Sequence, residues 1–437
     1  MIRRTLREWQ RIDYGDDEDA IPEAHADRIV AIAQRSSFAG RGGEGVLEHG
    51  RKSLRARGVV GVIAAPECQL EILPKIEGLG EREPNEADLR RRLIHMLGVV
   101  HDLPIDVGAV AQLGWQHHTV LELLIRLFCR QLADAVRQGI PRRYLTFEDD
   151  RPSLRGQLDV TRQFSQHAVA PQMLACRFDE LSPDIALNRV MRAVITRLLR
   201  LAQAPDNQRM LRELSFAYAD VSDVPVKALR WDLITLDRTN ERWRELLTFA
   251  RLFLFDRHQQ TSAGSIDGQA LLFEMNALFE NYVARLLPRA LSGKGFQVVA
   301  QGGHRDCLFE GELGRFRTKP DVIIRQGGRV VMVIDTKWKR MTPQIDDPKQ
   351  GVSQADVYQL MAYSQIYNCS NVMLLYPHHG ALPPDPIYTK YRIGTKNAQR
   401  ILTVATLDVT DSARMHVQRL SSLVERCICA EEQSKHE

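Results

Sequence analysis

Near its carboxyl end this chain carries two apolar runs, Lys319-Pro320-Asp321-Val322-Ile323-Ile324 and Val331-Met332-Val333-Ile334-Asp335-Thr336-Lys337. Short runs of aliphatic and β-branched residues predict strands, here over 321–325 and 329–337. Residues two apart in a strand point to the same side, so Asp335 and Lys337 share a face, about 6.6 Å apart along the chain, and Thr336 faces the other way. An acid and a lysine are therefore expected together where a buried strand ends.

The two strands are separated by the turn residues 326–328, which predict a β-hairpin. If all three residues form the loop, Asp321 faces Val333 and lies diagonally beside Asp335 on one surface. A slip by one residue would send Asp321 to the opposite face, unless a bulge compensates for it. The expected pairing of the two carboxylates therefore depends on the hairpin register.

Two carboxylates on one surface can share a divalent cation. Together with water and a backbone carbonyl they suit a hard, oxygen-binding ion such as Mg²⁺, and no Cys or His stands at this place to indicate zinc. Such an ion lowers the pKa of an attacking water and offsets charge on a phosphodiester in its transition state. Asp321 and Asp335 are thus candidate metal ligands and catalytic residues, and Lys337 is expected to hold the water or the developing charge. A simple salt bridge at a strand end is the alternative.

Two expected helices, over 271–287 and 354–367, carry further polar candidates. On the second, Gln359 and Tyr363 are one turn apart, and their amide and phenol form a stripe suited to a phosphate or a strand of DNA. On the first, Glu280 is placed to turn toward the same cation as a third metal ligand. The alternatives are a half-buried helix with polar tips and a solvated acid.

The length of 437 residues corresponds to about three domains at roughly 150 residues each. We expect a β-rich N-terminal module over 1–115, a mainly helical middle region over 116–262 and an α/β domain over 263–437, with the main boundary in the turn-rich residues 260–268. The fold class is therefore multidomain α/β. Further elements are expected as strands at 59–64, 70–73, 372–376 and 401–407, as helices at 119–137, 185–201 and 240–255, and as extended chain at 144–160.

Composition excludes several classes of protein. The 44% hydrophobic and 26% charged residues are those of a globular chain rather than a collagen-like or disordered one. The net charge of +4 is too small to demand nucleic acid as a ligand, so any basic surface must be local. The start lacks an apolar signal segment, no stretch approaches about eighteen apolar residues, and the cysteines are scattered. We therefore expect reduced thiols, a cytoplasmic location and no membrane span.

Several motifs lack the neighbouring sequence features that their usual function requires. Gly40-x-Gly42-x-x-Gly45 matches a dinucleotide-binding pattern, but no apolar strand precedes it and no good helix follows it. No GxxxxGKS/T sequence occurs, so the chain should not bind a nucleotide through a P-loop. The pairs His117-His118 and His378-His379 lack partners at metal-ligand spacing and are expected at the surface or at helix caps.

The order and spacing of Asp321, Asp335-Thr336-Lys337 and Gln359-x-x-x-Tyr363 resemble the PD-(D/E)xK nuclease superfamily, with the QxxxY helix of its RecB-like branch. Other stretches resemble the McrC family, the nuclease subunits of the McrBC restriction system that cuts modified DNA. They are Leu70-Glu71-Ile72-Leu73-Pro74-Lys75-Ile76, Leu154-Arg155-Gly156-Gln157-Leu158-Asp159, Phe178-Asp179-Glu180-Leu181, Asn188-Arg189, Met275-Asn276, Leu278-Phe279-Glu280 and Tyr358-Gln359-Leu360-x-Ala362-Tyr363.

The McrC resemblance implies a restriction-endonuclease-like C-terminal domain that cleaves methylcytosine-containing DNA with Mg²⁺. It implies an N-terminal region that docks into a ring of McrB, a GTP-hydrolysing AAA+ motor, and a chain that stimulates the GTPase of this partner, which itself binds the GTP. By the same resemblance, Asp321, Asp335 and Lys337 match the metal-binding and catalytic positions of the family, and Gln359 and Tyr363 its RecB-like motif.

The segment from Arg41 to Arg57 is the candidate contact with the ring, because a Gly-rich basic loop can enter a narrow pore and offer guanidinium groups to acids or phosphates. Its cations are Arg41, Arg51, Lys52, Arg55 and Arg57. Two rival functions stay open. One is a non-cleaving adaptor that activates a GTPase ring, and the other is a stand-alone DNA repair or transposition nuclease, which would not need the β-rich and helical regions that precede the nuclease part.

Overall fold

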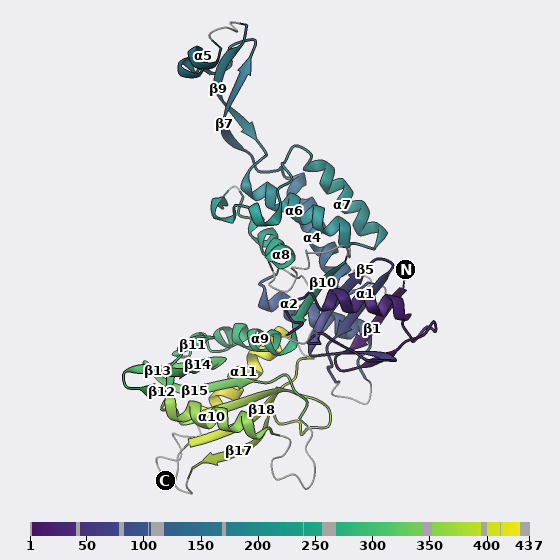
Figure 1. The fold of residues 1–437 in the computed structure, drawn as a ribbon. Helices are drawn as coiled ribbons and strands as arrows, with labels where there is room; N and C mark the ends of the chain where they lie inside the picture. Colours follow the sequence, from purple (N-terminus) through teal and green to yellow (C-terminus); the bar gives the residue numbers. More distant parts are fainter. Residues whose placement is uncertain are drawn as a thin grey trace. The chain divides into compact units, whose positions relative to one another are not determined.

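The computed structural model shows a mixed α/β protein (Figure 1). It describes residues 2–40, 44–77, 83–103, 105, 118–167, 172–238, 240–255, 268–341, 352–394, 400–410 and 412–428. The chain forms two compact units, one of residues 1–120 with 258–437 and the other of residues 121–257. The first and last parts of the chain thus share one unit, whereas three parts were expected from the sequence. None of the described helices has the length and apolar character needed to cross a lipid bilayer.

The N-terminal part of the first unit is built on a four-stranded sheet in the order β1-β6-β5-β10. Its strands are β1 (Ile2–Arg7), β5 (Val59–Ala65), β6 (Cys68–Leu73) and β10 (Gln269–Glu274). The strands expected at 59–64 and 70–73 are confirmed, but residues 271–274, expected to begin a helix, form β10 and pair antiparallel with β5. A short apolar run does not distinguish strand from helix by itself, and here the deciding partner lies about two hundred residues earlier.

Helix α1 (Glu23–Ala33) packs against β5 and β6 and buries its apolar face in the core of this sheet. A second, small sheet has the order β2-β4-β3 and contributes Ile12, Leu47 and Leu54 to the same core. Its strands are β2 (Arg11–Asp13), β3 (Leu47–His49) and β4 (Ser53–Ala56). The segment expected as a basic loop is therefore partly a sheet. Helix α2 (Glu86–Val100), capped by the Asn85 side chain, follows and packs against α9 (Met275–Ala290) of the C-terminal part.

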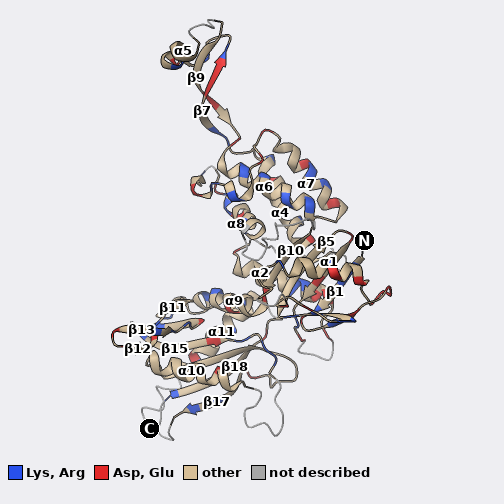
Figure 2. Ribbon diagram, in the orientation of Figure 1, with Lys and Arg blue, Asp and Glu red and all other residues tan. Residues whose placement is uncertain are grey.

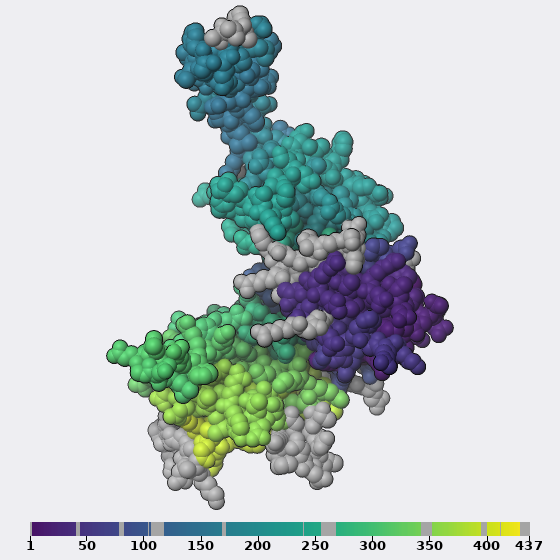
Figure 3. Space-filling model, viewed as in Figure 1, coloured from purple at the N-terminus to yellow at the C-terminus, as the bar shows by residue number. Residues whose placement is uncertain are grey.

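The second unit is mainly helical. Its helices are α4 (Val120–Arg137), α6 (Ala186–Leu201), α7 (Pro205–Ala217) and α8 (Trp243–Phe255), with short 3₁₀ turns at Val226–Ala228 and Trp231–Leu233. The exception is a β-hairpin that extends away from these helices (Figure 1) and forms a narrow projection from them (Figure 3). It consists of β7 (Arg143–Arg151), β8 (Gln157–Leu158), α5 (Val160–Gln166) and β9 (Leu174–Ser182).

The C-terminal part of the first unit is a six-stranded sheet in the order β11-β14-β15-β16-β18-β17. Its strands are β11 (Phe296–Ala300), β14 (Val322–Gln326), β15 (Arg329–Thr336), β16 (Asn371–Pro377), β17 (Ile387–Ile393) and β18 (Arg400–Leu407). Strands β15, β16 and β18 run parallel, and α10 (Gln354–Ile366) lies in the crossover between the first two. The remaining elements are α9 (Met275–Ala290), α11 (Ala413–Ile428) and the separate hairpin β12 (Asp306–Glu310) and β13 (Leu313–Arg317).

The register of the β14–β15 hairpin differs from the expected one. Only Gly327 and Gly328 form the loop, and both have positive φ, +55° and +78°, as the favoured two-residue hairpin turns require. A bulge between Ile324 and Arg325 then shifts the ladder, so that Val322 pairs with Ile334. The residue before Val322 is thereby aligned with the end of β15. Relative to the expected pairing, the register is shifted by two residues. Because side chains alternate with a period of two, an even shift does not exchange the faces of the strand, and it brings Asp321 and Asp335 closer together.

Candidate active site

The end of β15 carries a buried ion pair. Asp335 is only 1% exposed, and its Oδ2 lies 2.6 Å from Nζ of Lys337. The backbone N–H of Lys337 donates to the Leu375 carbonyl of β16 at 2.9 Å, which continues the parallel pairing one residue past the strand. The predicted proximity of this acid and this lysine is therefore present, and neighbouring backbone fixes it.

Asp321 lies directly before β14, across the hairpin from that ion pair. Its Oδ2 accepts hydrogen bonds from the backbone N–H of Thr336 at 2.7 Å and from the Thr336 hydroxyl at 2.9 Å. The threonine between the acid and the lysine, which the sequence assigned to the other face of the strand, thus orients the carboxylate of the neighbouring strand.

Mutual repulsion among three carboxylates marks this region. Burial raises the pKa of Asp335 to about 6, and the negative charge of Asp321 adds to the shift. Burial also raises the pKa of Asp321, with Glu280 as the next contribution. Burial also raises the pKa of Glu280. A hydrogen bond from Gln301 lowers this pKa, whereas the charge of Asp335 raises it. The three acids expected from the sequence therefore influence one another in the folded chain.

Lys337 stays cationic beside these acids. Although burial lowers its pKa, the hydrogen bond and charge of Asp335 outweigh burial, and the pKa lies above its ordinary value. The ammonium group is therefore available to bind negative charge or a water molecule at neutral pH.

Gln301 connects the elements that carry the acids. Its side-chain amide donates to Oε1 of Glu280 on α9 at 2.9 Å, and its backbone N–H donates to the Asp321 carbonyl at 2.9 Å. It adopts a positive φ of +47° at the end of β11. The sequence offered no sign of this role, because the two contacts depend on the antiparallel pairing of β11 with β14.

The predicted pair on α10 is present as one hydrogen-bonded unit. The Gln359 amide donates to the Tyr363 hydroxyl at 2.8 Å. Burial raises the pKa of Tyr363, and the charges of Asp335 and Asp321 contribute in the same direction, so both carboxylates lie near enough to act on the phenol. Tyr367, at the C-terminal end of the same helix, is buried and donates to the Gly303 carbonyl at 3.0 Å, which makes it a packing residue.

Two further charged residues adjoin the site and were missed by the sequence reasoning. Asp356, buried on α10, forms an ion pair with Lys339, in which Oδ2 lies 3.1 Å from Nζ. Its charge contributes to the raised pKa values of Asp335 and Lys337. The only sequence signals were indirect ones: Asp356 precedes Gln359 by three residues on one helix, and Lys339 follows Lys337 by two.

The chemistry of the donor set fits a hard divalent cation. Every donor is a carboxylate, and carboxylates that raise one another's pKa values gain from a cation that neutralises them. Among the described residues, however, no group of three or more His, Cys, Asp or Glu side chains is arranged as a ready metal cluster. Asp321 and Asp335 are thus the residues that can hold the ion, while Glu280, held by Gln301, stands nearby in electrostatic contact.

The candidate partner-contact cations have a different setting from the one expected. Arg41 lies outside the described residues, and Arg51 and Lys52 are exposed in the turn between β3 and β4. Arg57 lies 2.6 Å from Glu48, which Arg55 approaches at 3.6 Å, and both guanidinium groups lie over the Trp9 ring. Two of the five cations are therefore engaged within the small sheet rather than presented on a loop.

Two histidines expected at the surface or at helix caps are buried at a strand end instead. His378 shares a hydrogen bond with the Thr406 hydroxyl at 2.8 Å, and Nε2 of His379 donates to the Met341 carbonyl at 2.7 Å. They follow β16 directly, so the end of a buried strand carries them inside. Of the other pair, His117 lies outside the described residues.

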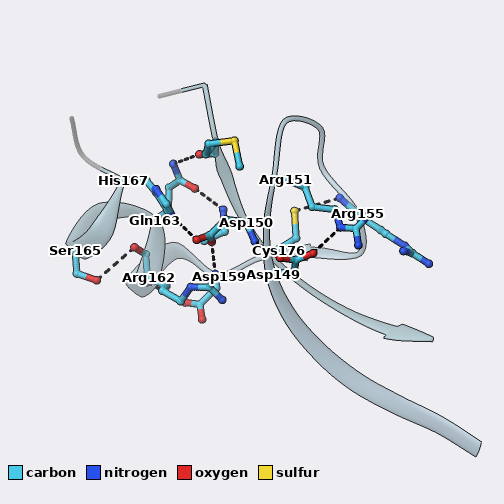
Figure 4. A network of polar contacts seen from close by, with 12 residues as sticks. Asp149, Asp150, Arg151, Arg155, Asp159, Arg162, Gln163, Ser165, His167 and Cys176 are labelled. Atoms are coloured by element: carbon cyan, nitrogen blue, oxygen red, sulfur yellow. Dashed lines mark hydrogen bonds and ion pairs between the residues drawn. The ribbon is translucent and has the colours of Figure 1, made fainter. Parts of the chain in front are cut away.

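The hairpin of the second unit ends in a compact polar network (Figure 4). Asp150 on β7 pairs with Arg162 and, at 3.0 Å, with Nε2 of His167, which ties α5 to the sheet. Gln163 bridges α5 to β9 by donating to the Met173 carbonyl and accepting from the Ala175 N–H. The tip is therefore a preformed structure that side-chain contacts hold together.

The same hairpin exposes many apolar side chains. They are Tyr144, Phe147, Leu154, Leu158, Val160, Phe164 and Leu181. Basic residues accompany them, and Arg155 lies over the Phe178 ring at 4.2 Å. In the same unit, further arginines stand on α6 and α7 (Figure 2). Exposed apolar groups gathered on one projection are typical of an interaction surface.

Comparison with known proteins relates the chain to restriction systems. A chain of the refined half-complex from the tetradecameric assembly of Thermococcus gammatolerans McrB AAA+ hexamers with bound McrC is similar over 97% of this protein and 100% of its own length, with a TM-score of 0.73 and 22% identity. A chain of the cryo-EM structure of the Thermococcus gammatolerans McrBC complex is similar over 66% of this protein and 88% of its own length, with a TM-score of 0.53 and 24% identity. At these identities the likeness concerns the fold.

No protein of curated function matches the sequence. The family model described as McrBC 5-methylcytosine restriction system component matches residues 54–377, which include most of the N-terminal sheet, the second unit and the candidate active site. This protein therefore belongs to the family of McrBC 5-methylcytosine restriction system components.

Proposed function

We propose that this protein is a Mg²⁺-dependent DNA endonuclease whose active site is of the PD-(D/E)xK type. The observation that carries the proposal is the buried Asp335–Lys337 pair at the tail of β15, with Asp321 aligned beside it at the head of β14. A site of this kind has an acid pair for a metal ion and a cation for the developing charge of a phosphodiester, as phosphodiester hydrolysis requires.

Each residue has a role in this proposal. Asp321 and Asp335 would hold Mg²⁺, which when bound supplies a water of lowered pKa and neutralises phosphate charge. Lys337 places its ammonium group where it can orient the attacking water or bind the phosphate oxygens. Tyr363 and Gln359 form a polar edge for the DNA strand, and Glu280 adds negative charge that favours a cation nearby.

We further propose that the chain works with a GTP-hydrolysing AAA+ ring. The support is the fold shared with a chain of the Thermococcus gammatolerans assembly of McrB AAA+ hexamers with bound McrC and the membership in the restriction-system family. In this proposal the complex cuts methylcytosine-containing DNA, the partner binds GTP, and this chain stimulates its GTPase.

The hairpin of the second unit is the better-supported contact with such a ring. Its apolar side chains are exposed and its tip is preformed, whereas Arg55 and Arg57 of the earlier candidate segment are bound to Glu48. A rigid projection loses little conformational entropy on docking, which favours binding.

The test of the nuclease is the replacement Asp335→Ala in the complete complex with its GTPase partner. Cleavage of methylated DNA should disappear and stimulation of the partner's GTPase should persist, with Glu312→Ala, an exposed acid of the β12–β13 turn, as the matched control. Retained cleavage would refute the assigned site.

The same assay separates the rival functions. If the wild-type chain never cleaves but stimulates GTP hydrolysis, the protein is an adaptor. If the purified chain cuts DNA with Mg²⁺ alone, without partner and GTP, it is a stand-alone nuclease.

A further inference from the structure

Trp338 follows the catalytic lysine directly and contacts two other parts of the first unit. Its backbone N–H donates to Oδ1 of Asn276 at 3.1 Å, and its ring packs against Phe279 with the ring centroids 5.4 Å apart. Both partners belong to α9, the helix that carries Glu280. Its indole N–H donates to Oε2 of Glu8 at 2.9 Å. The segment that leaves the active site is thus bound to the N-terminal part of the chain.

Glu8 is rigidly held at its own end of this contact. It follows β1 and is 2% exposed, its backbone N–H donates to the Leu73 carbonyl at 2.9 Å, and its Oε2 accepts a second hydrogen bond from the Lys75 backbone N–H at 3.0 Å. β1 and β6 pair in parallel and both end here, so the sheet itself sets the position of the carboxylate. Burial raises the pKa of Glu8 to about 7.

A cavity of about 280 Å³ adjoins the Glu8–Trp338 contact. Charged and titratable groups face it from Lys75 and Glu77 after β6, from Lys339 and Arg340 after Trp338, and from His378 and His379 after β16. Oε1 of Glu8 is buried and has no hydrogen-bond partner among the described residues. A cavity of this size can hold several water molecules, through which this carboxyl can exchange its proton.

A second contact between the same two parts of the chain lies two residues after Trp338. Arg340 pairs with Glu77 at 2.9 Å, so the stretch after the catalytic lysine is bound twice to the N-terminal part. Between these points Lys339 pairs with Asp356 of α10. The three residues that follow the catalytic lysine are therefore held by side-chain contacts.

We propose that Glu8 is a positioning residue for DNA cleavage: by binding the indole of Trp338, the N-terminal part holds the end of β15 so that Asp335 and Lys337 keep their reactive geometry. This inference rests on the proposed nuclease function. Its consequence is that this hydrogen bond, between residues 330 positions apart in sequence, helps to couple folding of the N-terminal sheet to assembly of the active site.

The kinetic test separates this hydrogen bond from packing. Trp338→Phe keeps a ring against Phe279 but removes the indole N–H, Glu8→Ala removes the acceptor, and Glu8→Gln keeps an acceptor oxygen. In the complete complex we expect the first two variants to lower kcat for cleavage about tenfold with little change in KM, the double variant to be no worse than either, and Glu8→Gln to remain near wild type.

Trp9→Phe is the matched control, since Trp9 lines the same cavity but the indole N–H that Glu8 accepts is that of Trp338, and it should leave kcat unchanged. Equal kcat in wild type, Trp338→Phe and Glu8→Ala, or additive losses in the double variant, would overturn the inference. If the wild-type complex does not cleave at all, the nuclease proposal itself fails instead.

A second measurement needs no cleavage. The indole ¹⁵N–¹H resonance of Trp338, identified by its absence in Trp338→Phe, should shift with pH through about 7 in the wild-type chain and stay constant in Glu8→Gln. A resonance that does not respond to pH in the wild type, or that responds equally in both, would contradict the contact.

Discussion

Asp321 accepts two hydrogen bonds from Thr336 through a single carboxylate oxygen, one from the backbone N–H at 2.7 Å and one from the hydroxyl at 2.9 Å. This relationship joins the head of β14 to the tail of β15 at the residue between Asp335 and Lys337. The other carboxylate oxygen of Asp321 does not take part in these two bonds. In the proposed site Thr336 would orient Asp321 as a metal ligand, a role that active sites commonly give to neighbouring polar groups.

Thr336→Val should separate this role from packing, because valine keeps the branched shape and loses the hydroxyl donor. We expect cleavage to fall about tenfold or more and the free energy of unfolding to fall by about 1–3 kcal/mol, since the buried carboxylate loses a hydrogen bond. Thr336→Ser should retain most activity. Thr403→Val, at another buried threonine of the same sheet, should lose stability without losing kcat. An equal loss of kcat in Thr403→Val would show that the effect is only structural.

Asp335 should destabilise the metal-free protein at neutral pH. Its folded-state pKa of about 6 lies above the ordinary value of 3.8, so its favourable contribution to stability is complete below pH 4 and is lost as pH rises through 6. In the presence of EDTA, Asp335→Asn should therefore be more stable than wild type by up to about 3 kcal/mol above pH 7, and the advantage should shrink toward pH 4. Urea unfolding at the two pH values measures this. A less stable Asp335→Asn at pH 7.5 would contradict it.

Tyr363→Phe should weaken cleavage while leaving the helix in place. The variant removes the acceptor for the Gln359 amide and for the Lys319 backbone N–H, next to the residue pair Pro320–Asp321. We expect a fall in kcat of about tenfold with little change in Tm. Tyr358→Phe is the matched control on the same helix, because Tyr358 is 59% exposed and its hydroxyl accepts from the exposed Gln354 side chain. Comparable losses in both variants would remove Tyr363 from the site.

Phe164→Ser tests the hairpin as the partner surface. Phe164 is 74% exposed on α5, so its replacement should change the stability of the isolated chain by less than about 0.5 kcal/mol. Stimulation of the partner's GTPase should nevertheless fall, because an exposed aromatic at the tip is a natural anchor. Phe216→Ser, on α7 of the same unit and 85% exposed, is the control. Unchanged stimulation in Phe164→Ser would place the contact elsewhere.

The part of the site that the sequence predicted is the part encoded by local spacing. Asp335 and Lys337 are two residues apart on one strand, and Gln359 and Tyr363 are four apart on one helix, so period alone brings each pair together. The alignment of Asp321 was expected in general and wrong in register, because the two-glycine turn is one residue shorter than assumed and the bulge at Ile324 cannot be seen in the sequence.

What the sequence did not show depends on contacts between distant segments. Strand β10 was predicted as helix because its partner β5 lies about two hundred residues earlier, and Glu8 gave no sign of its hydrogen bond to Trp338. His378 and His379 were expected at the surface or at helix caps, but they directly follow the buried strand β16 and are buried with it. Tertiary packing determines the positions and contacts of these residues, and local periodicity in the sequence does not predict them.

The most direct measurement is anomalous diffraction from crystals of this protein grown with Mn²⁺ as a stand-in for Mg²⁺. The proposed active site predicts an anomalous peak coordinated by the carboxylates of both Asp321 and Asp335, lost in Asp335→Ala. A protein that cleaves DNA while its cation binds away from these two residues would contradict the proposal.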